Sequence, residues 1–157
     1  MATPDGHRRA IASNQIVLDE LKSCLDAGTA PWVTVLAFYK ALHQVELLLR
    51  LDSRSPSRRG ASSHEVRGDL LRNTRHYAAV YLHYSALKRA SEVARYLEVA
   101  GYAYESFAEY MSLDDVRSQV LGHSLVQFEA AVGRILVPQH GPDFLALAVK
   151  PPPTPDG

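Results

Sequence analysis

The sequence contains one set of side chains suited to acid–base or anion-binding chemistry. His43 and Glu46 are three residues apart, and His64 and Arg67 have the same spacing further along the chain. Residues three apart share one face of an α-helix, so each pair presents two polar groups to the same neighbour. Side by side, the two helices would gather these groups into a small polar pocket for a phosphate or a nucleotide. The alternative is a hydrogen-bonded network that holds the helices in register.

Two further groups of residues are candidates for contact with nucleic acid. One is the basic residues of a serine-rich segment: Arg54, Arg58 and Arg59. The other is a stripe at helical spacing: Tyr77, Tyr81, Tyr84 and Lys88. Arginines bind phosphate oxygens, and aromatic rings beside a cation can stack on bases. The alternatives are a solvated loop and tyrosines that belong to the core. No second carboxylate-rich pair accompanies His43 and Glu46, so we expect neither a metal nor a cofactor.

Apolar periodicity places these residues on helices. The predicted helical segments are 10–27, 32–51, 62–73, 77–99 and 112–137. Leu121, Leu125, Phe128, Val132 and Ile135 form a seam at alternating spacings of four and three in the last segment. Residues 102–110 fit no element clearly, and no convincing strand is found. Short connections favour antiparallel neighbours. The predicted fold is therefore all-α, an antiparallel up-and-down bundle of four main helices plus a shorter one.

The predicted domain organisation is simple. Residues 10–137 form a single helical domain, residues 1–9 a flexible N-terminus, and residues 138–157 a proline-rich, largely disordered tail. Residues 52–63 contain no large apolar side chain, so they are expected to form an exposed, mobile loop between two helices.

Three segments resemble a known family. They are FYKALHQVELLLRL (38–51), SSHEVRGDLL (62–71) and YLHYSALKRASEVARYLE (81–98). Together they resemble the HEPN superfamily of helical bundles. Its members are commonly dimeric and often belong to nucleic-acid metabolism, toxin–antitoxin or defence systems. The resemblance implies a binding or regulatory module that acts on RNA, a nucleotide or a protein partner. The alternative is a metal-independent ribonuclease of the same superfamily.

The ribonuclease alternative can be checked against the family motif. Catalytic members carry an arginine followed four to six residues later by a histidine. The spacing occurs from Arg58 or Arg59 to His64, from Arg117 to His123 and from Arg134 to His140. The stretch from Arg72 to His76 begins like the motif, but its histidine comes one residue early. We therefore assign no catalytic residue from the sequence.

Charge and composition restrict partners and location. Lysine plus arginine and aspartate plus glutamate number 17 each, so the formal net charge is zero. No bulk field attracts nucleic acid or an anionic membrane, so any such contact must be local. The start of the chain lacks an apolar signal region, and the single Cys24 excludes an internal disulfide. We expect a cytoplasmic homodimer with no membrane contact.

Overall fold

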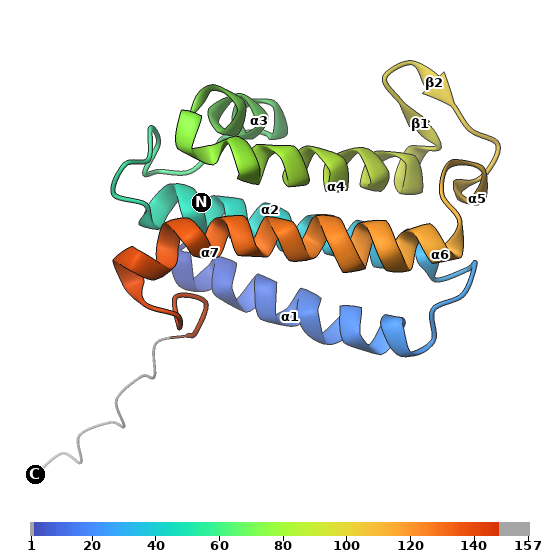
Figure 1. The fold of residues 1–157 in the computed structure, drawn as a ribbon, viewed down its shortest axis with the longest axis horizontal. Helices are drawn as coiled ribbons and strands as arrows, with labels where there is room; N and C mark the ends of the chain where they lie inside the picture. Colours follow the sequence, from blue (N-terminus) through green and yellow to red (C-terminus); the bar gives the residue numbers. More distant parts are fainter. Residues whose placement is uncertain (1, 148–157) are drawn as a thin grey trace, which may run out of the picture.

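The computed structural model describes residues 2–147, and most of them are helical (Figure 1). The long helical segments are α1 (Pro4–Ser23), α2 (Ala30–Leu51), α4 (Ala78–Tyr96) and a continuous helix from Leu113 to His140. The shorter ones are α3 (His64–Asn73), η1 (Arg75–Tyr77) and α5 (Phe107–Tyr110). The long segments follow the longest axis of the molecule, and each runs opposite to the one before it. The prediction of an all-α fold is confirmed.

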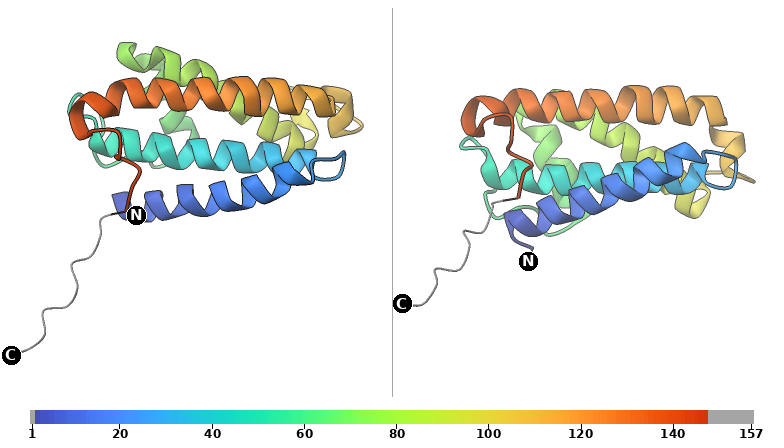
Figure 2. Two further views of the ribbon diagram at one scale, coloured as in Figure 1. Left: turned by 60° about the horizontal axis from the view of Figure 1, so that its bottom comes forward. Right: turned by 90° about the horizontal axis from the view of Figure 1, so that it is seen from below.

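Helix α2 lies at the centre of the molecule. It contacts α1 on one side and α4 and the last helix on the other. In the turned views, α2 therefore lies between α1 and these two helices (Figure 2). This position explains why apolar residues cover most of its circumference, with Phe38, Val45 and Leu48 fully buried. Phe128 and Val132 of the predicted seam are also fully buried. The core is therefore built around the most apolar predicted helix.

The first helix begins earlier than the sequence predicts. Thr3 caps α1, because its hydroxyl oxygen accepts a 3.1 Å hydrogen bond from the Gly6 N–H, and Pro4 occupies the first turn. A capping threonine followed by proline is a helix start signal that the search for apolar periodicity missed. The prediction of a flexible N-terminus is therefore wrong for residues 4–9. The early start of α1 bears on the candidate site, because His7 is buried in this first turn.

Helix α4 ends three residues before the predicted end at residue 99 and is followed by a small hairpin. Leu97 has a positive φ of 54°, and strand β1 (Glu98–Val99) then pairs antiparallel with β2 (Tyr102–Ala103). Ala100 and Gly101 both have positive φ, as a type I′ turn requires. The prediction that the chain contains no strand is therefore wrong. Each strand has only two residues, so the sequence contains no alternating apolar pattern that would indicate it.

The last helix has three parts that form one continuous element: α6 (Leu113–Asp115), the π-helical η2 (Val116–Leu125) and α7 (Val126–His140). Ser112 and Asp115 form a capping box at the start of this helix. Within residues 2–147 this helix alone is long and apolar enough, by length and composition, to cross a membrane. Core helices of soluble proteins pass the same test, and Phe128, Val132 and Leu136 of this helix are fully buried.

The C-terminal end of this helix also differs from the prediction. The helix continues through Pro138 to His140, since a proline in the last turn removes few intrahelical hydrogen bonds. The chain then folds back on α1, where the Phe144 carbonyl accepts a 2.9 Å bond from Arg8 Nε. The predicted disordered tail is therefore wrong for residues 138–147, and its remainder, 148–157, lies outside the described residues.

Candidate functional site

The structure brings Glu46 of α2 and Arg67 of α3 into a buried ion pair. Arg67 Nε donates to Glu46 Oε1 at 2.8 Å, and Arg67 Nη2 lies 2.7 Å from the same oxygen. The two side chains are only 8% and 5% exposed. Helix α3 starts at His64, two residues after the predicted start of this segment, because the Ser63 hydroxyl accepts a hydrogen bond from the Val66 N–H. This start places Arg67 over Glu46.

The segment before α3 closes over this ion pair. The Ala61 N–H donates to both carboxylate oxygens of Glu46 at 3.3 Å. Gly60 has a φ of +86°, and a Cβ there would collide with the Glu46 carboxylate and lie 2.9 Å from Arg50 Nη2. Only glycine fits this close approach. This role of Gly60 was not expected, because residues 52–63 were predicted to form a mobile loop.

His43 lies at the same cluster but has a different partner. Its Nδ1 is 3.1 Å from Nδ1 of His7 on α1, so one ring donates and the other accepts. Burial lowers the pKa of His43, and the Arg67 charge lowers it further. Burial and the neighbouring His43 likewise lower the pKa of His7. The sequence analysis missed His7 because it lies in the segment predicted to be flexible.

His64 is the member of the predicted pocket that faces open space. Its Nδ1 lies 3.3 Å from Arg67 Nη1, and its ring stacks on Phe38 with 6.0 Å between the ring centres. Burial lowers the pKa of His64, with Arg67 and Lys88 contributing, so the imidazole is neutral near pH 7. The four predicted residues thus lie together. Glu46, Arg67 and His43 form an interhelical network, and His64 belongs to the wall of a groove.

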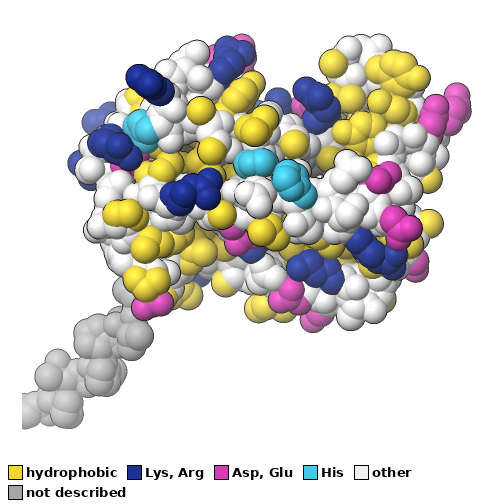
Figure 3. All heavy atoms as spheres, viewed as in Figure 1, with side chains coloured by type: hydrophobic (Ala, Val, Ile, Leu, Met, Phe, Trp, Pro, Cys, Tyr) yellow, Lys and Arg dark blue, Asp and Glu magenta, His cyan; other side chains and the backbone are white. Residues whose placement is uncertain are grey.

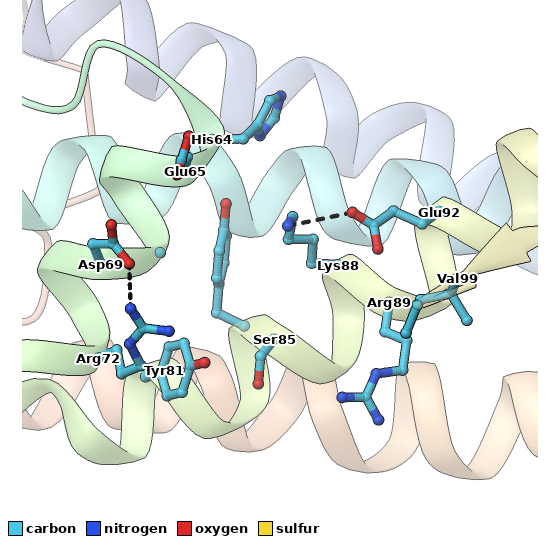
Figure 4. Close-up of a pocket in the computed structure, with 13 residues that line it drawn as sticks. His64, Glu65, Asp69, Arg72, Tyr81, Ser85, Lys88, Arg89, Glu92 and Val99 are labelled. Carbon is cyan, nitrogen blue, oxygen red and sulfur yellow. Dashed lines mark hydrogen bonds and ion pairs between the residues drawn. The ribbon is translucent and has the colours of Figure 1, made fainter. Parts of the chain in front are cut away.

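That groove lies between α3 and α4 and has a volume of about 600 Å³ (Figure 4). Tyr81, Tyr84 and Lys88 of the predicted stripe line it from α4, and His64 and Arg72 line it from α3. Tyr84 is only 1% exposed, and its buried hydroxyl has no hydrogen-bond partner within residues 2–147. Burial raises the pKa of Tyr84, so the hydroxyl is a neutral donor.

The charges of the groove are mixed. Lys88 Nζ lies 3.3 Å from Glu92 Oε1, and Arg72 pairs with Asp69 (Figure 4). Each of these side chains is at least 30% exposed. Exposed pairs of this kind contribute little, so the cations can exchange their carboxylate partner for a ligand at small cost.

Other predicted nucleic-acid residues lie outside the groove. Tyr77 is fully buried, and its hydroxyl donates a 2.8 Å bond to Asp52 Oδ2, so its ring has no free face for a base. The prediction for Tyr77 is therefore wrong, because its side chain lies in the hydrophobic core. Arg54, Arg58 and Arg59 are exposed on the segment between α2 and α3 and do not line the groove.

Asp52 is a second buried polar centre that the sequence did not reveal. The carboxylate accepts bonds from Tyr77, from His76 Nε2 at 2.8 Å and from Gln139 Nε2 at 2.9 Å. Burial alone raises the pKa of Asp52, but the hydrogen bonds from Gln139, His76 and Tyr77 outweigh it and hold the pKa well below its ordinary value. This centre joins the ends of α2, η1 and α7.

Comparison with known proteins assigns no relative. No family model, curated protein or solved structure matches the chain. Within residues 2–147, no three histidine, cysteine or acidic side chains are placed to hold a metal ion together.

Proposed function

We propose that this chain is a HEPN-like helical binding module that takes a phosphate-bearing ligand, a nucleotide or RNA, in the groove between α3 and α4. The observation that carries the proposal is that Tyr81, Lys88 and His64, selected from two separate sequence patterns, line one groove. Its volume of about 600 Å³ lies within the range of roughly 300 to 1,000 Å³ of small-ligand sites. The HEPN resemblance adds a toxin–antitoxin or defence context.

Each part of the groove has a task in this proposal. The half-buried ring of Tyr81 offers a face for a base, and Lys88 and Arg72 offer charge to a phosphate from opposite walls. The unpartnered Tyr84 hydroxyl at the floor can donate to a ligand oxygen. The Glu46–Arg67 pair fixes α3 against α2, which keeps the two walls at a constant separation.

Ribonuclease activity is the second candidate, and the state of His64 favours it. A neutral imidazole in the groove can accept the proton of a 2′-hydroxyl as that oxygen bonds to the adjacent phosphorus, while Lys88 or Arg72 stabilises the negative charge on the phosphoryl oxygens. The bond from phosphorus to the 5′ oxygen then breaks, and the 5′ oxygen takes a proton from water, which leaves a 2′,3′-cyclic phosphate. The same reaction needs no metal ion.

The test is a titration of the parent protein and of Lys88→Gln with nucleotides and short RNA. Loss of one charge-assisted contact should weaken binding by about 1.5 to 3 kcal/mol, which is roughly 10- to 100-fold. Lys22→Gln is the matched control, because Lys22 lies outside the groove and forms an exposed i,i+3 pair with Asp19 of α1. This pair resembles the exposed i,i+4 pair of Lys88 with Glu92.

If the parent protein binds neither nucleotide nor RNA, the proposal is refuted. Equal losses of affinity in Lys88→Gln and Lys22→Gln would also refute it. The RNA is also analysed for cleavage. Intact RNA supports the binding module, whereas cleavage that His64→Gln abolishes supports the ribonuclease.

A further inference from the structure

A pair of histidines lies on the surface outside the groove. His83 of α4 and His123 of the last helix have ring centres 5.6 Å apart, with the ring planes at 76°. The space-filling view shows two histidine side chains together in the middle of the face formed by α4 and the last helix (Figure 3). His123 is exposed and His83 is partly exposed, so solvent reaches the pair.

The separation of the rings fits shared coordination of one ion. A histidine nitrogen binds Zn²⁺ at about 2.1 Å, which places each ring centre about 3.2 Å from the metal. Two imidazoles on a tetrahedral ion then have ring centres about 5.2 Å apart, and wider ligand angles increase this value to about 6.4 Å. The observed separation of 5.6 Å between the ring centres lies inside this interval.

The chemistry of the two side chains also suits a metal. Neutral imidazole is the form that binds transition metals, and it prefers zinc, copper and nickel to hard ions such as magnesium. The positive charge of Arg134 near His83 lowers the affinity of the site for a cation. Within residues 2–147, Arg134 forms no hydrogen bond with either histidine ring.

The backbone around His123 is unusual. The residue lies in the π-helical stretch Val116–Leu125, which contacts α4. π-helical turns are rare and occur frequently at functional sites. His83 lies between Tyr81 and Tyr84 in the sequence, so the histidine pair uses the same helix as the groove but is absent from the groove lining.

We propose that His83 and His123 together bind one divalent transition-metal ion of the zinc, nickel and copper class and thereby join α4 to the last helix. Two protein ligands leave the other coordination positions to water or to an external ligand. The site is independent of the proposed function of the groove.

The test is calorimetric titration of untagged protein with Ni²⁺, with Mg²⁺ as the hard-cation control. We expect one Ni²⁺ per chain and no detectable Mg²⁺ binding. Because both rings hold the same ion, His83→Gln and His123→Gln should each weaken Ni²⁺ binding at least tenfold. His140→Gln, which removes another exposed histidine of the same helix, should leave the affinity unchanged.

A second readout tests the bridge between helices. Ni²⁺ should raise the melting temperature of the parent protein and of His140→Gln but not of His83→Gln, since an ion held by both helices stabilises the folded state. Retention of parental affinity in both His83→Gln and His123→Gln would overturn the proposal. Loss in only one of them would also overturn it, because that result describes a single-histidine site.

Discussion

At the scale of single residues, the Glu46–Arg67 pair is the point on which the groove depends. Both side chains are almost fully buried, and Arg50 Nη2 adds a second positive charge 3.8 Å from Glu46 Oε2. A buried ion pair gains little over apolar packing, but removal of one partner leaves a charge without compensation. The pair should therefore act as a structural element whose loss affects folding before it affects binding.

Arg67→Ala should lower the free energy of unfolding by about 3 to 5 kcal/mol, because Glu46 loses its closest cation while remaining buried. Urea unfolding measures the loss. Arg72→Ala is the control, since it removes an exposed arginine of the same helix and should cost less than about 1 kcal/mol. Parental stability of Arg67→Ala combined with abolished nucleotide binding would show that Arg67 is a ligand contact instead.

Asp52 gives a prediction with a defined pH dependence. Asp52→Asn should cost about 1.5 to 3 kcal/mol at pH 7, because the carboxylate accepts bonds from Tyr77, His76 and Gln139. The pKa of Asp52 is lowered in the folded state, so this stabilisation is present above the unfolded pKa of about 3.9 and is lost as the pH falls below it.

Urea unfolding at pH 7 and pH 3 therefore should show a difference between parent and Asp52→Asn that shrinks at the lower pH. Asp69→Asn, an exposed carboxylate of α3, should show little difference at either pH. A gap for Asp52→Asn that is equal at both pH values would contradict the assignment of the effect to the carboxylate charge.

The residues of the site were only partly predictable from the sequence. Helical spacing correctly placed Glu46 and Arg67 on facing helices, because local periodicity determines which face a residue occupies. His7, Gly60 and Asp52 were missed, since each acts through contact with residues far away in the chain. No local pattern records such a contact.

At the scale of elements, the segment between α2 and α3 differs most from its prediction. Residues 52–63 were expected to be mobile throughout, but Asp52 is fully buried at one end and Gly60 is buried at the other. The Gly60 N–H donates to the Ser57 carbonyl at 3.0 Å, and the Ala61 N–H donates to Glu46. The segment is thus fixed at Asp52 and at Gly60 and Ala61, and its exposed residues lie between these points and at positions 62–63.

Amide hydrogen exchange should reflect this division. We expect slow exchange at Gly60 and Ala61 and fast exchange at the exposed Arg58 and Arg59, since hydrogen-bonded amides exchange through local opening. Glu46→Gln should accelerate exchange at Ala61 more than at Gly60, whose acceptor is a backbone carbonyl. Fast exchange at all four amides of the parent protein would show that this segment does not close over Glu46.

Helix centres were predictable, and several helix ends were not. The apolar periodicity of residues 32–51 and 121–135 comes from helix faces that pack on the core, so it does not depend on where each helix begins or ends. The ends depend on single residues. Thr3 begins α1, the positive φ of Leu97 terminates α4, and Pro138 is accommodated in the last turn of α7.

At the scale of the whole molecule, histidines whose pKa is lowered in the folded state make stability depend on pH. Burial is the main cause that lowers the pKa of His7, His43, His64 and His83 below the ordinary value of 6.5. Between the folded and unfolded pKa values the unfolded chain binds more protons. Stability is therefore fully present above about pH 6.5 and falls as the pH drops below it.

Urea unfolding at pH 7.5 and pH 5.5 should show lower stability at the more acidic pH. His43→Gln should reduce this decline, because glutamine can hydrogen-bond His7 but does not titrate. His140→Gln, at an exposed position, should decline like the parent. Equal declines in His43→Gln and His140→Gln would show that the His7–His43 contact does not contribute to acid sensitivity.

The last prediction concerns assembly. Large apolar side chains are exposed on several elements, with Trp32 64%, Leu82 63% and Tyr96 67% accessible. Aromatic residues are enriched at protein interfaces, and a net charge of zero provides no repulsion between copies. We expect light scattering at micromolar concentration to give twice the chain mass of 17.3 kDa. Trp32→Ser, at the most exposed large aromatic of α2, should shift the population toward monomer, whereas a parental mass of one chain would refute the dimer.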